Sequence, residues 1–395
     1  MTTTGQTSGM RLRAVGIALA LAMLLMPAVA AQGQTFKVLY SFTGGADGGY
    51  PFAALIEDAK GNLYGTTSAQ YCGAVFKVNK SGKVTVLHSF DCGPGGGDPY
   101  ASLLLHAGSL YGTTCCGGGY YYGVVYSMSD TGEGWEALCN FTGEGAGEYP
   151  YAGLVRDAAG NLYGTTAYGG TSGDGTVFKL SKSGNETVLY SFTGRTGKYP
   201  FQSLVAGKGF DDLFGATEEG GKYGYGTVFK VATKTGKETV LHSFEYNGSD
   251  GAYPAYGYLV HDPQGNLYGT TEIGGPSGAG TVFKLTPDGT ETVLYGFSGG
   301  ADGGYPFAGV VLDKNGNLYG TTYEGGDLHC GNVYGCGTVF MLDTGGKETV
   351  LHTFTGGSDG AHPAAALLRD AAGDLYGTAS EGGAYDYGTL FKLTP

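Results

Sequence analysis

Charged residues are scarce in this chain, which has 395 residues of which 14% are Asp, Glu, Lys or Arg. The 35 acids outnumber the 22 bases, which gives a formal net charge of −13. This charge disfavours nucleic acid as a partner, because the protein and the nucleic acid would both be negatively charged. Glycine is abundant instead, with 78 residues, and tyrosine contributes 31. Since 41% of the residues are hydrophobic and occur in short regular runs, we expect a folded chain with many tight turns rather than a disordered one.

The chain lacks an apolar tail, and its one long apolar run lies near the N-terminus. Arg11 and Arg13 precede the apolar run Ala14–Met26, and the small residues Ala28–Ala30 follow it. This order predicts a secretory signal peptide over residues 1–30. The run is shorter than the roughly 20 residues that a membrane helix needs. With no lipid-attachment cysteine after it, we expect a secreted or periplasmic mature chain without membrane insertion.

One short segment, Leu-Tyr-Gly-Thr-Thr or a close variant, recurs seven times at intervals of roughly 50 residues. Such a period is typical of repeat proteins in which every copy forms one structural unit. The central glycines of the seven copies are Gly65, Gly112, Gly164, Gly215, Gly269, Gly320 and Gly377.

Each copy contains four short runs, which we name A, B, C and D in chain order. In the third copy they are Tyr149–Asp157, Leu162–Thr166, Gly175–Leu180 and Glu186–Phe192. Their β-branched and aromatic residues, bounded by Gly, Asp, Asn or Pro, are typical of β-strands. An Asp-x-x-Gly-Asn turn between A and B favours a tight hairpin. Four such strands in about 50 residues match one blade of a β-propeller.

The two ends of the mature chain complement each other. Residues Lys37–Phe42 form a spare D run, and the chain stops after a C run at Gly388–Leu393. A closed ring uses this offset, because the N-terminal strand completes the last blade. We therefore predict an all-β domain over residues 31–395, a seven-bladed β-propeller with four antiparallel strands per blade. An open β-solenoid is the alternative.

The repeat resembles a known bacterial family. Asp-x-x-Gly-Asn-Leu-Tyr-Gly-Thr-Thr, followed by Gly-Gly and Gly-Thr-Val-Phe-Lys, is similar to the GloVer (Gloeobacter/Verrucomicrobia-type) tandem repeat of "choice-of-anchor" proteins. The resemblance covers essentially the whole mature chain, and the second copy departs most, with His106–Ser109 in place of the turn. It implies an exported, propeller-like repeat protein and supplies no catalytic residue.

Candidate ligand contacts lie on the face that carries the B–C and D–A loops, because these loops are long and irregular and loops on a rigid scaffold commonly carry function. The residue before the proline of run A is aromatic in six copies. These rings could surround the channel mouth as a stacking surface for carbohydrate or a peptide, or they could pack between blades. The residues are Tyr50, Tyr149, Tyr199, Tyr253, Tyr305 and His362.

Acidic residues recur after run B, at Glu219, Glu272, Glu324 and Glu381. A ring of carboxylates could bind a cation or a basic ligand, or the acids could be solvated loop residues. No copy has the acid density of a dedicated calcium loop. We therefore expect no cofactor, and the sequence indicates calcium only weakly.

The seven cysteines cluster rather than repeat. Cys330 and Cys336 flank a five-residue loop and are expected to pair in an oxidising compartment. One or two further disulfides are expected in the first two copies, with a connectivity that the sequence leaves open. No Cys-x-x-Cys pair occurs, so we expect no metal site. The remaining cysteines are Cys72, Cys92, Cys115, Cys116 and Cys139.

No single Ser, Cys, His or carboxylate stands apart from the repeat as a catalytic centre. The sequence therefore favours a monomeric, exported, non-catalytic binding or interaction module with a carbohydrate, protein or peptide ligand on the B–C/D–A face. One alternative is a secreted propeller enzyme, a lyase or glycosidase acting on polysaccharide. Another is a purely structural component of the cell envelope.

Overall fold

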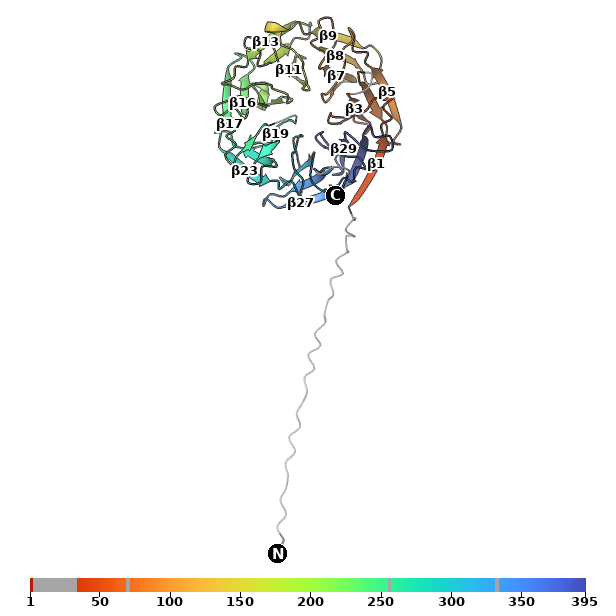
Figure 1. Ribbon diagram of the computed structural model, residues 1–395, viewed down its shortest axis with the longest axis vertical. Coiled ribbons are helices and arrows are strands. Elements are labelled where there is room, and N and C mark those ends of the chain that lie inside the picture. The colour runs from red at the N-terminus through yellow and green to blue at the C-terminus, as the bar shows by residue number, and fades with distance from the viewer. Residues whose placement is uncertain (3–33, 69–71, 255–256, 331–333) are drawn as a thin grey trace. The chain divides into compact units, whose positions relative to one another are not determined.

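The computed structural model describes residues 1–2, 34–68, 72–254, 257–330 and 334–395. Residues 34–395 form one compact unit, in which seven four-stranded antiparallel sheets are arranged as the blades of a ring (Figure 1). The predicted seven-bladed β-propeller is confirmed. The predicted signal peptide lies, apart from its first two residues, outside the described part of the chain. Within that part, no helix is long and apolar enough to cross a membrane.

Every blade begins with a very short inner strand from run A, followed by a longer strand from run B. The run A strands are β2 (Ile56–Glu57), β6 (Leu104–His106), β10 (Val155–Arg156), β14 (Val205–Ala206), β19 (Val260–His261), β24 (Val311–Leu312) and β28 (Leu368–Arg369). The run B strands are β3 (Leu63–Thr67), β7 (Ser109–Thr114), β11 (Leu162–Thr166), β15 (Asp212–Thr217), β20 (Leu267–Thr271), β25 (Leu318–Thr322) and β29 (Leu375–Ala379).

Runs C and D supply the two outer strands, and the D strands lie at the rim in Figure 1. The run C strands are β4 (Ala74–Val78), β8 (Val124–Ser129), β12 (Thr176–Leu180), β16 (Thr227–Ala232), β22 (Thr281–Leu285), β26 (Thr338–Leu342) and β30 (Thr389–Thr394). The run D strands are β5 (Val84–Ser89), β9 (Glu136–Asn140), β13 (Glu186–Ser191), β17 (Glu238–Ser243), β23 (Glu291–Gly296), β27 (Glu348–Thr353) and β1 (Thr35–Ser41).

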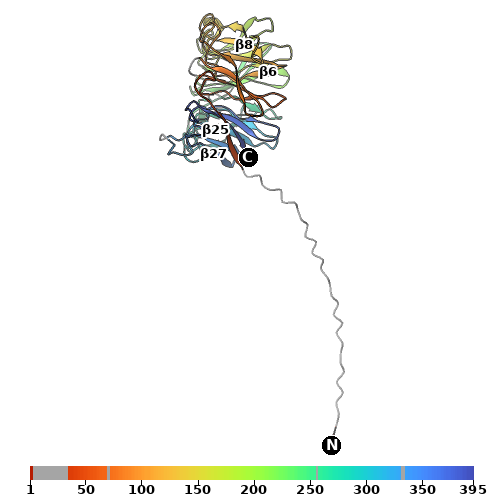
Figure 2. The ribbon, with the colours of Figure 1, turned by 90° about the vertical axis from the view of Figure 1, so that its right-hand side faces the viewer.

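Three small elements lie in the loops: η1 (Glu144–Ala146), η2 (Lys208–Phe210) and the two-stranded pair of β18 (Gly251–Ala252) with β21 (Ile273–Gly274). We number the blades by their run A strand, so that blade 1 begins with β2 and blade 7 with β28. Figure 2 views the ring from the side, with β6 and β8 of blade 2 and β25 and β27 of blade 6 in opposite parts of it.

The ring closes through the N-terminal strand, as the offset of the chain ends predicts. β1 pairs antiparallel with β30, from Thr35 opposite Thr394 to Ser41 opposite Thr389, and completes the sheet of blade 7. The Thr378 hydroxyl also donates to the carbonyl of Pro51 at 3.0 Å, which ties blade 7 to blade 1 across the closure.

The hydrophobic core lies between neighbouring blades rather than inside any one of them. Between blades 3 and 4, for example, Phe192 meets Phe229 edge to face at 4.8 Å in a cluster of fully buried side chains. The glycine of Leu-Tyr-Gly-Thr makes this packing possible. A Cβ on Gly164 would lie 2.8 Å from the Phe178 ring and 3.0 Å from Leu154, so a larger residue would displace the phenylalanine.

The A–B hairpins confirm a structural role for their aspartates. Asp157 accepts hydrogen bonds from the backbone N–H of Asn161 at 2.8 Å, from the Asn161 amide at 2.7 Å and from the Tyr163 hydroxyl at 3.0 Å. In blade 1, burial would raise the pKa of Asp58, but the equivalent hydrogen bonds from Asn62 and Tyr64 outweigh it and lower that pKa to about 2.

Run A forms a much shorter strand than its length in the sequence suggests. Only two or three residues pair with run B, because the proline has no N–H to donate and the residue before it turns the chain. That residue has a φ between 52° and 59° in all seven blades, although it is never glycine. The first part of run A is therefore a loop at the centre of the B–C/D–A face.

Candidate ligand site at the mouth of the ring

The residue before the proline joins two blades through its backbone. The N–H of Tyr149 donates to the Tyr122 carbonyl of blade 2 at 2.9 Å, and its own carbonyl accepts from the N–H of Ala167 in blade 3 at 3.1 Å. Equivalent bonds recur at Tyr199, Tyr253, Tyr305 and His362. A left-handed residue that is repeated in every blade is part of the architecture of the ring.

The side chains of these residues lie at the blade junctions. The Tyr149 ring meets Tyr122 and Tyr168 edge to face at 5.8 Å each, and Tyr50 meets Tyr387 at the same distance. His362 is buried, and its Nδ1 lies 2.9 Å from the Tyr323 carbonyl. These side chains therefore have a structural role at the blade junctions. Their role as ligand contacts stays a prediction.

The predicted acids occupy two different positions. Glu219, Glu324 and Glu381 lie two residues after their run B strands, in backbone bridges to the preceding D–A loop. Glu272 instead follows β20 directly, and its equivalent in blade 4 is Glu218. Glu381 lies 3.8 Å from His362 Nε2. The four acids are thus spread over the face rather than gathered in one ligand shell.

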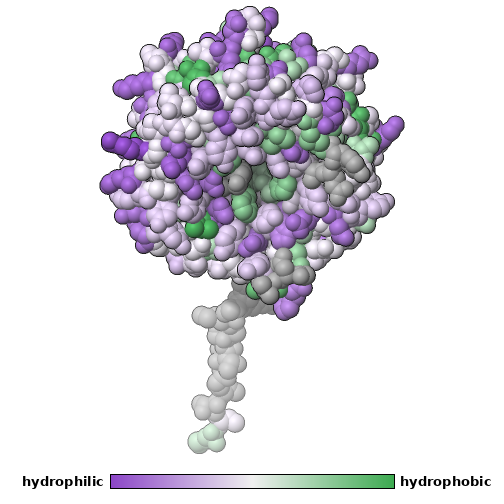
Figure 3. Space-filling view, turned by 45° about the horizontal axis from the view of Figure 1, so that its top comes forward, coloured by the Kyte–Doolittle hydropathy of each residue, from purple (hydrophilic) through white to green (hydrophobic). Residues whose placement is uncertain are grey.

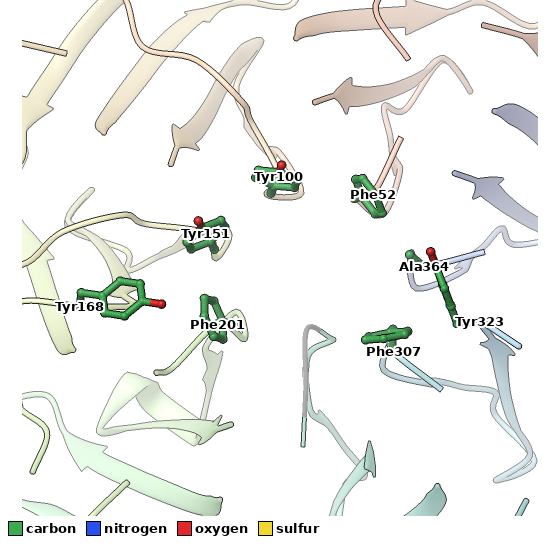
Figure 4. Close-up of a pocket in the computed structure, with 8 residues that line it drawn as sticks. All are labelled: Phe52, Tyr100, Tyr151, Tyr168, Phe201, Phe307, Tyr323 and Ala364. Carbon is green, nitrogen blue, oxygen red and sulfur yellow. The ribbon is translucent and has the colours of Figure 1, made fainter. Parts of the chain in front are cut away.

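A cavity of about 470 Å³ lies at the centre of this face, and we call it the mouth cavity. Figure 3 shows one face of the ring hollowed at its centre, with hydrophobic residues in the hollow. Six of the eight lining residues directly follow the proline of run A. The lining residues are Phe52, Tyr100, Tyr151, Tyr168, Phe201, Phe307, Tyr323 and Ala364 (Figure 4).

The sequence predicts ligand contacts at the residue before this proline, whereas the residue after it lines the mouth cavity. A signal for the second position does exist: it is aromatic in five copies and alanine in the other two, at residues 255 and 364. Residue 255 lies outside the described part of the chain. Because the residue before the proline is left-handed, the neighbour that points into the mouth could not be chosen from alternation alone.

Four rings from successive blades form a continuous arc along one side of the mouth cavity. Phe52 lies 5.8 Å from Tyr100, Tyr100 lies 5.5 Å from Tyr151, and Tyr151 lies 5.2 Å from Phe201, measured between ring centroids. On the other side Phe307 meets Tyr323 at 4.7 Å, and Figure 4 shows this pair apart from the arc. The mouth cavity is therefore lined by two separate aromatic surfaces.

Tyr258 forms the floor of the mouth cavity. Run A of blade 5 is one residue longer than in the other blades, with nine steps from Tyr253 to Asp262. Tyr258 packs against Ala54, Ala308 and Ala366 in the channel, and burial raises the pKa of its hydroxyl to about 12. A space of only about 30 Å³ separates it from the mouth rings. The mouth is thus a bowl rather than an open channel.

An acidic edge borders the mouth cavity on the side of blades 4 to 6. Burial, and then the charges of Glu272 and Glu219, raise the pKa of Glu218 to about 7. Burial and the charge of Glu324 raise the pKa of Glu272 as well. Glu218 interacts electrostatically with the mouth residue Tyr168, and Glu324 does so with Tyr323. These groups can bind a cation, donate a proton or accept a hydrogen bond.

Two disulfides lie on this face. Cys330–Cys336 is confirmed, and Cys72–Cys92 is one of the further bonds expected in the first two repeats. Cys115, Cys116 and Cys139 remain thiols. The Cys116 thiol lies 3.3 Å from an Asp98 carboxylate oxygen, and burial together with the nearby Glu186 raises the pKa of Cys139 to about 12.

The repeat matches the model of the Gloeobacter/Verrucomicrobia repeat over residues 28–210 and 146–334. The chain therefore belongs to this family of repeat proteins, as its motifs indicate. No curated protein matches it.

Several solved propellers are similar to the chain at low sequence identity. Virginiamycin B lyase from Staphylococcus aureus has a TM-score of 0.57 and 14% identity, over 92% of this chain and 99% of the lyase. A provisionally assigned 6-phosphogluconolactonase from Bacteroides uniformis has a TM-score of 0.51 and 14% identity, over 76% of this chain and 84% of its own. At such identity the likeness concerns the fold alone.

Proposed function

We propose that this chain is an exported, non-catalytic binding module that holds a carbohydrate in the mouth cavity. The observation that carries the proposal is the aromatic bowl of about 470 Å³ with Tyr258 as its floor. Its volume falls in the range of small-molecule sites, which are mostly apolar concavities with a few polar groups. Sugar rings present apolar C–H faces that stack on aromatic side chains, and hydroxyls that tyrosine can hydrogen-bond.

The arc of four rings contributed by blades 1 to 4 suits an extended ligand better than a compact one. Its four rings follow one another at 5.2 to 5.8 Å around the curve of the mouth. An oligosaccharide could lay successive units along this curve, whereas one sugar would contact two rings at most. The hydroxyls of Tyr100 and Tyr151 offer polar contacts within the same surface.

The acidic edge restricts the charge of the ligand. Glu218, Glu272 and Glu324 would repel uronic acids and sulfated sugars, and the net charge of −13 adds to that repulsion. Neutral or amino-bearing glycans fit this environment. The signal peptide predicted from the sequence and the two disulfides support a location outside the cytoplasm.

The test is a titration of the purified mature chain with cello-oligosaccharides, chitosan oligosaccharides and oligogalacturonides. We expect binding of at least one of the first two and none of the third. Tyr151→Ala should weaken binding about tenfold, since a stacked aromatic contributes about 1–1.5 kcal/mol. Tyr120→Ala is the matched control, because Tyr120 is 58% exposed and lies outside the mouth cavity. Equal affinities for the two variants would contradict the proposal.

A second candidate function is glycoside cleavage, favoured by the neighbouring acids Glu218 and Glu272. A carboxyl group with a pKa of about 7 can protonate a leaving sugar oxygen while a second, ionised carboxylate assists. Release of reducing ends from a bound oligosaccharide, abolished in Glu218→Gln and retained in Glu219→Gln, would establish cleavage. Binding without any release would favour the non-catalytic module.

A further inference from the structure

One junction between blades brings together a histidine and two carboxylates, none of which lines the mouth cavity. His242 lies on β17, Asp250 follows it in the D–A loop of the same blade, and Glu291 begins β23 of the next blade. His242 Nε2 lies 3.2 Å from Asp250 Oδ2, and one ligand atom from each of the three residues lies within 4.8 Å of the others. We propose that His242, Asp250 and Glu291 bind a divalent transition-metal ion that links blade 4 to blade 5.

The fold holds two of the three ligands in place. Asp250 accepts the backbone N–H of Glu245 at 3.0 Å and that of Gly251 at 2.7 Å, which orients its carboxylate. The His242 ring packs edge to face on Phe244 at 4.7 Å. Ligand atoms around a metal at 2.0–2.2 Å are about 3–3.5 Å apart, so only a small movement of Glu291 would close the site.

The surroundings of Glu291 also favour a cation. Its Oε1 is buried and has no hydrogen-bond partner among the described residues. A bound metal would supply the positive charge that this carboxylate lacks, in a place where solvent reaches only 19% of the His242 side chain and 11% of that of Asp250.

Two other junctions are built in the same way but lack one ligand each, which makes them natural controls. Between blades 5 and 6, Tyr295 replaces the histidine and donates to Asp302 at 3.0 Å, with Glu348 starting the next D strand. Between blades 6 and 7, His352 lies 3.2 Å from Asp359, but Phe36 replaces the glutamate and stacks on the imidazole at 3.6 Å.

The combination of ligands is what distinguishes the blade 4–5 junction. Glu186, Glu238 and Glu348 also have a buried oxygen without a partner, so that feature alone does not define a site. Their neighbours in the preceding D strand are Cys139, Tyr190 and Tyr295 rather than a histidine with an aspartate. Within the described residues, the blade 4–5 junction is the one that unites an imidazole with two carboxylates.

One imidazole nitrogen and two carboxylate oxygens suit zinc or manganese, with water in the remaining positions. Calcium prefers six to eight oxygen ligands and fits less well. The sequence predicts no metal site, because it contains no Cys-x-x-Cys pair and His242 occupies a strand position that recurs in the other repeats. The approach of the three ligands depends on two blades lying side by side.

The test uses the untagged mature chain after chelator treatment, titrated calorimetrically with zinc chloride and separately with manganese chloride. We expect one site per chain for at least one of these ions, and a higher Tm in its presence. His242→Tyr, which copies the blade 5–6 junction, and Glu291→Gln should each weaken binding at least tenfold. His352→Tyr, the same exchange at a junction without the glutamate, should leave binding unchanged.

Three outcomes would overturn the proposal. The first is a wild-type chain that binds neither ion. The second is equal binding by wild type and His242→Tyr, which would assign the metal to other groups such as the three thiols. The third is equal loss in His242→Tyr and His352→Tyr. Circular dichroism and the metal-free Tm of each variant separate loss of ligands from loss of fold, and Glu291→Gln keeps the size of the side chain.

Discussion

On the hairpin face of the ring, aspartates such as Asp157 accept three or more hydrogen bonds each, and their pKa values are lowered. On the mouth face, Glu218 and Glu272 lie half-buried beside aromatic rings and other acids, and their pKa values are raised. The same chemical group thus stabilises a turn on one face and remains available for a ligand on the other. The difference lies in whether donors surround the carboxylate.

The largest expected effect is on the hairpin face. Asp157→Ala removes the acceptor for Asn161 and Tyr163 and should cost about 2–3 kcal/mol of unfolding free energy. Glycan binding at the mouth should not change, because the hairpin lies at the other end of the blade. Urea denaturation measures the first quantity and calorimetric titration the second. Glu133→Ala, an exposed acid, should change stability by less than about 0.5 kcal/mol.

A change in stability no larger in Asp157→Ala than in Glu133→Ala would show that the hairpin aspartates are not structural. A loss of glycan affinity in a folded Asp157→Ala protein would show that the hairpin face and the mouth face are coupled.

On the mouth face, a smaller effect is expected from pH. Affinity for a chitosan oligosaccharide should pass through a maximum between pH 6 and 8, because Glu218, with a pKa of about 7, gains its negative charge over the interval in which the ligand amines lose their protons. A neutral cello-oligosaccharide, titrated over the same interval, corrects for effects unrelated to charge. Glu218→Gln should flatten the pH profile, while Glu219→Gln should retain a maximum that moves to lower pH, because the charge of Glu219 raises the pKa of Glu218. A maximum that persists in Glu218→Gln would assign it to another group.

The smallest expected effect concerns stability against pH. The first residues of four D strands, Glu186, Glu238, Glu291 and Glu348, have pKa values raised by burial to about 7. An acid that binds its proton more tightly when folded stabilises the protein below its unfolded pKa. That contribution is lost as pH rises through the folded value. Asp58, with a pKa of about 2, instead stabilises the folded protein above its unfolded pKa. This contribution to stability is lost only as the pH falls towards 2.

The Tm should therefore be highest near pH 4–5 and fall by a few degrees towards pH 7, as scanning calorimetry at several pH values can measure. Replacing Glu238 and Glu348 together by Gln should reduce this fall, and Glu133→Gln should not. A Tm that rises steadily from pH 4.5 to 7 would mean that these glutamates are ionised in the folded protein.

Much of the fold could be predicted from the sequence, because every repeat carries the same strand and turn signals. Seven copies of four strand-like runs indicate seven blades, and the spare run at Lys37–Phe42 indicates closure, which the pairing of β1 with β30 confirms. The structural role of the turn aspartates follows from the sequence because their side-chain hydrogen bonds reach residues four and six positions along the chain. The Cys330–Cys336 bond was predicted for the same reason, since its partners are six residues apart.

The candidate site was predicted only to the level of a face. The backbone at Tyr149 has a φ of 56°, so the chain turns and Tyr151 rather than Tyr149 lines the mouth cavity. The floor depends on a one-residue insertion before Leu259, which is easily missed among repeats of variable length. Glu218 and Glu219 are adjacent acids in the sequence, and only the fold shows that Glu218 is buried beside Glu272.

By itself, the sequence determined the repeat, the number of blades, the closing strand and the unlike faces, because these follow from local strand and turn chemistry repeated at a regular spacing. The tertiary structure alone decided which aromatic residues meet at the mouth, that Tyr258 fills the channel, and that His242, Asp250 and Glu291 come together. Each of these arrangements joins residues from different blades, and the positions of different blades are set by packing between them rather than by the order of residues within a repeat.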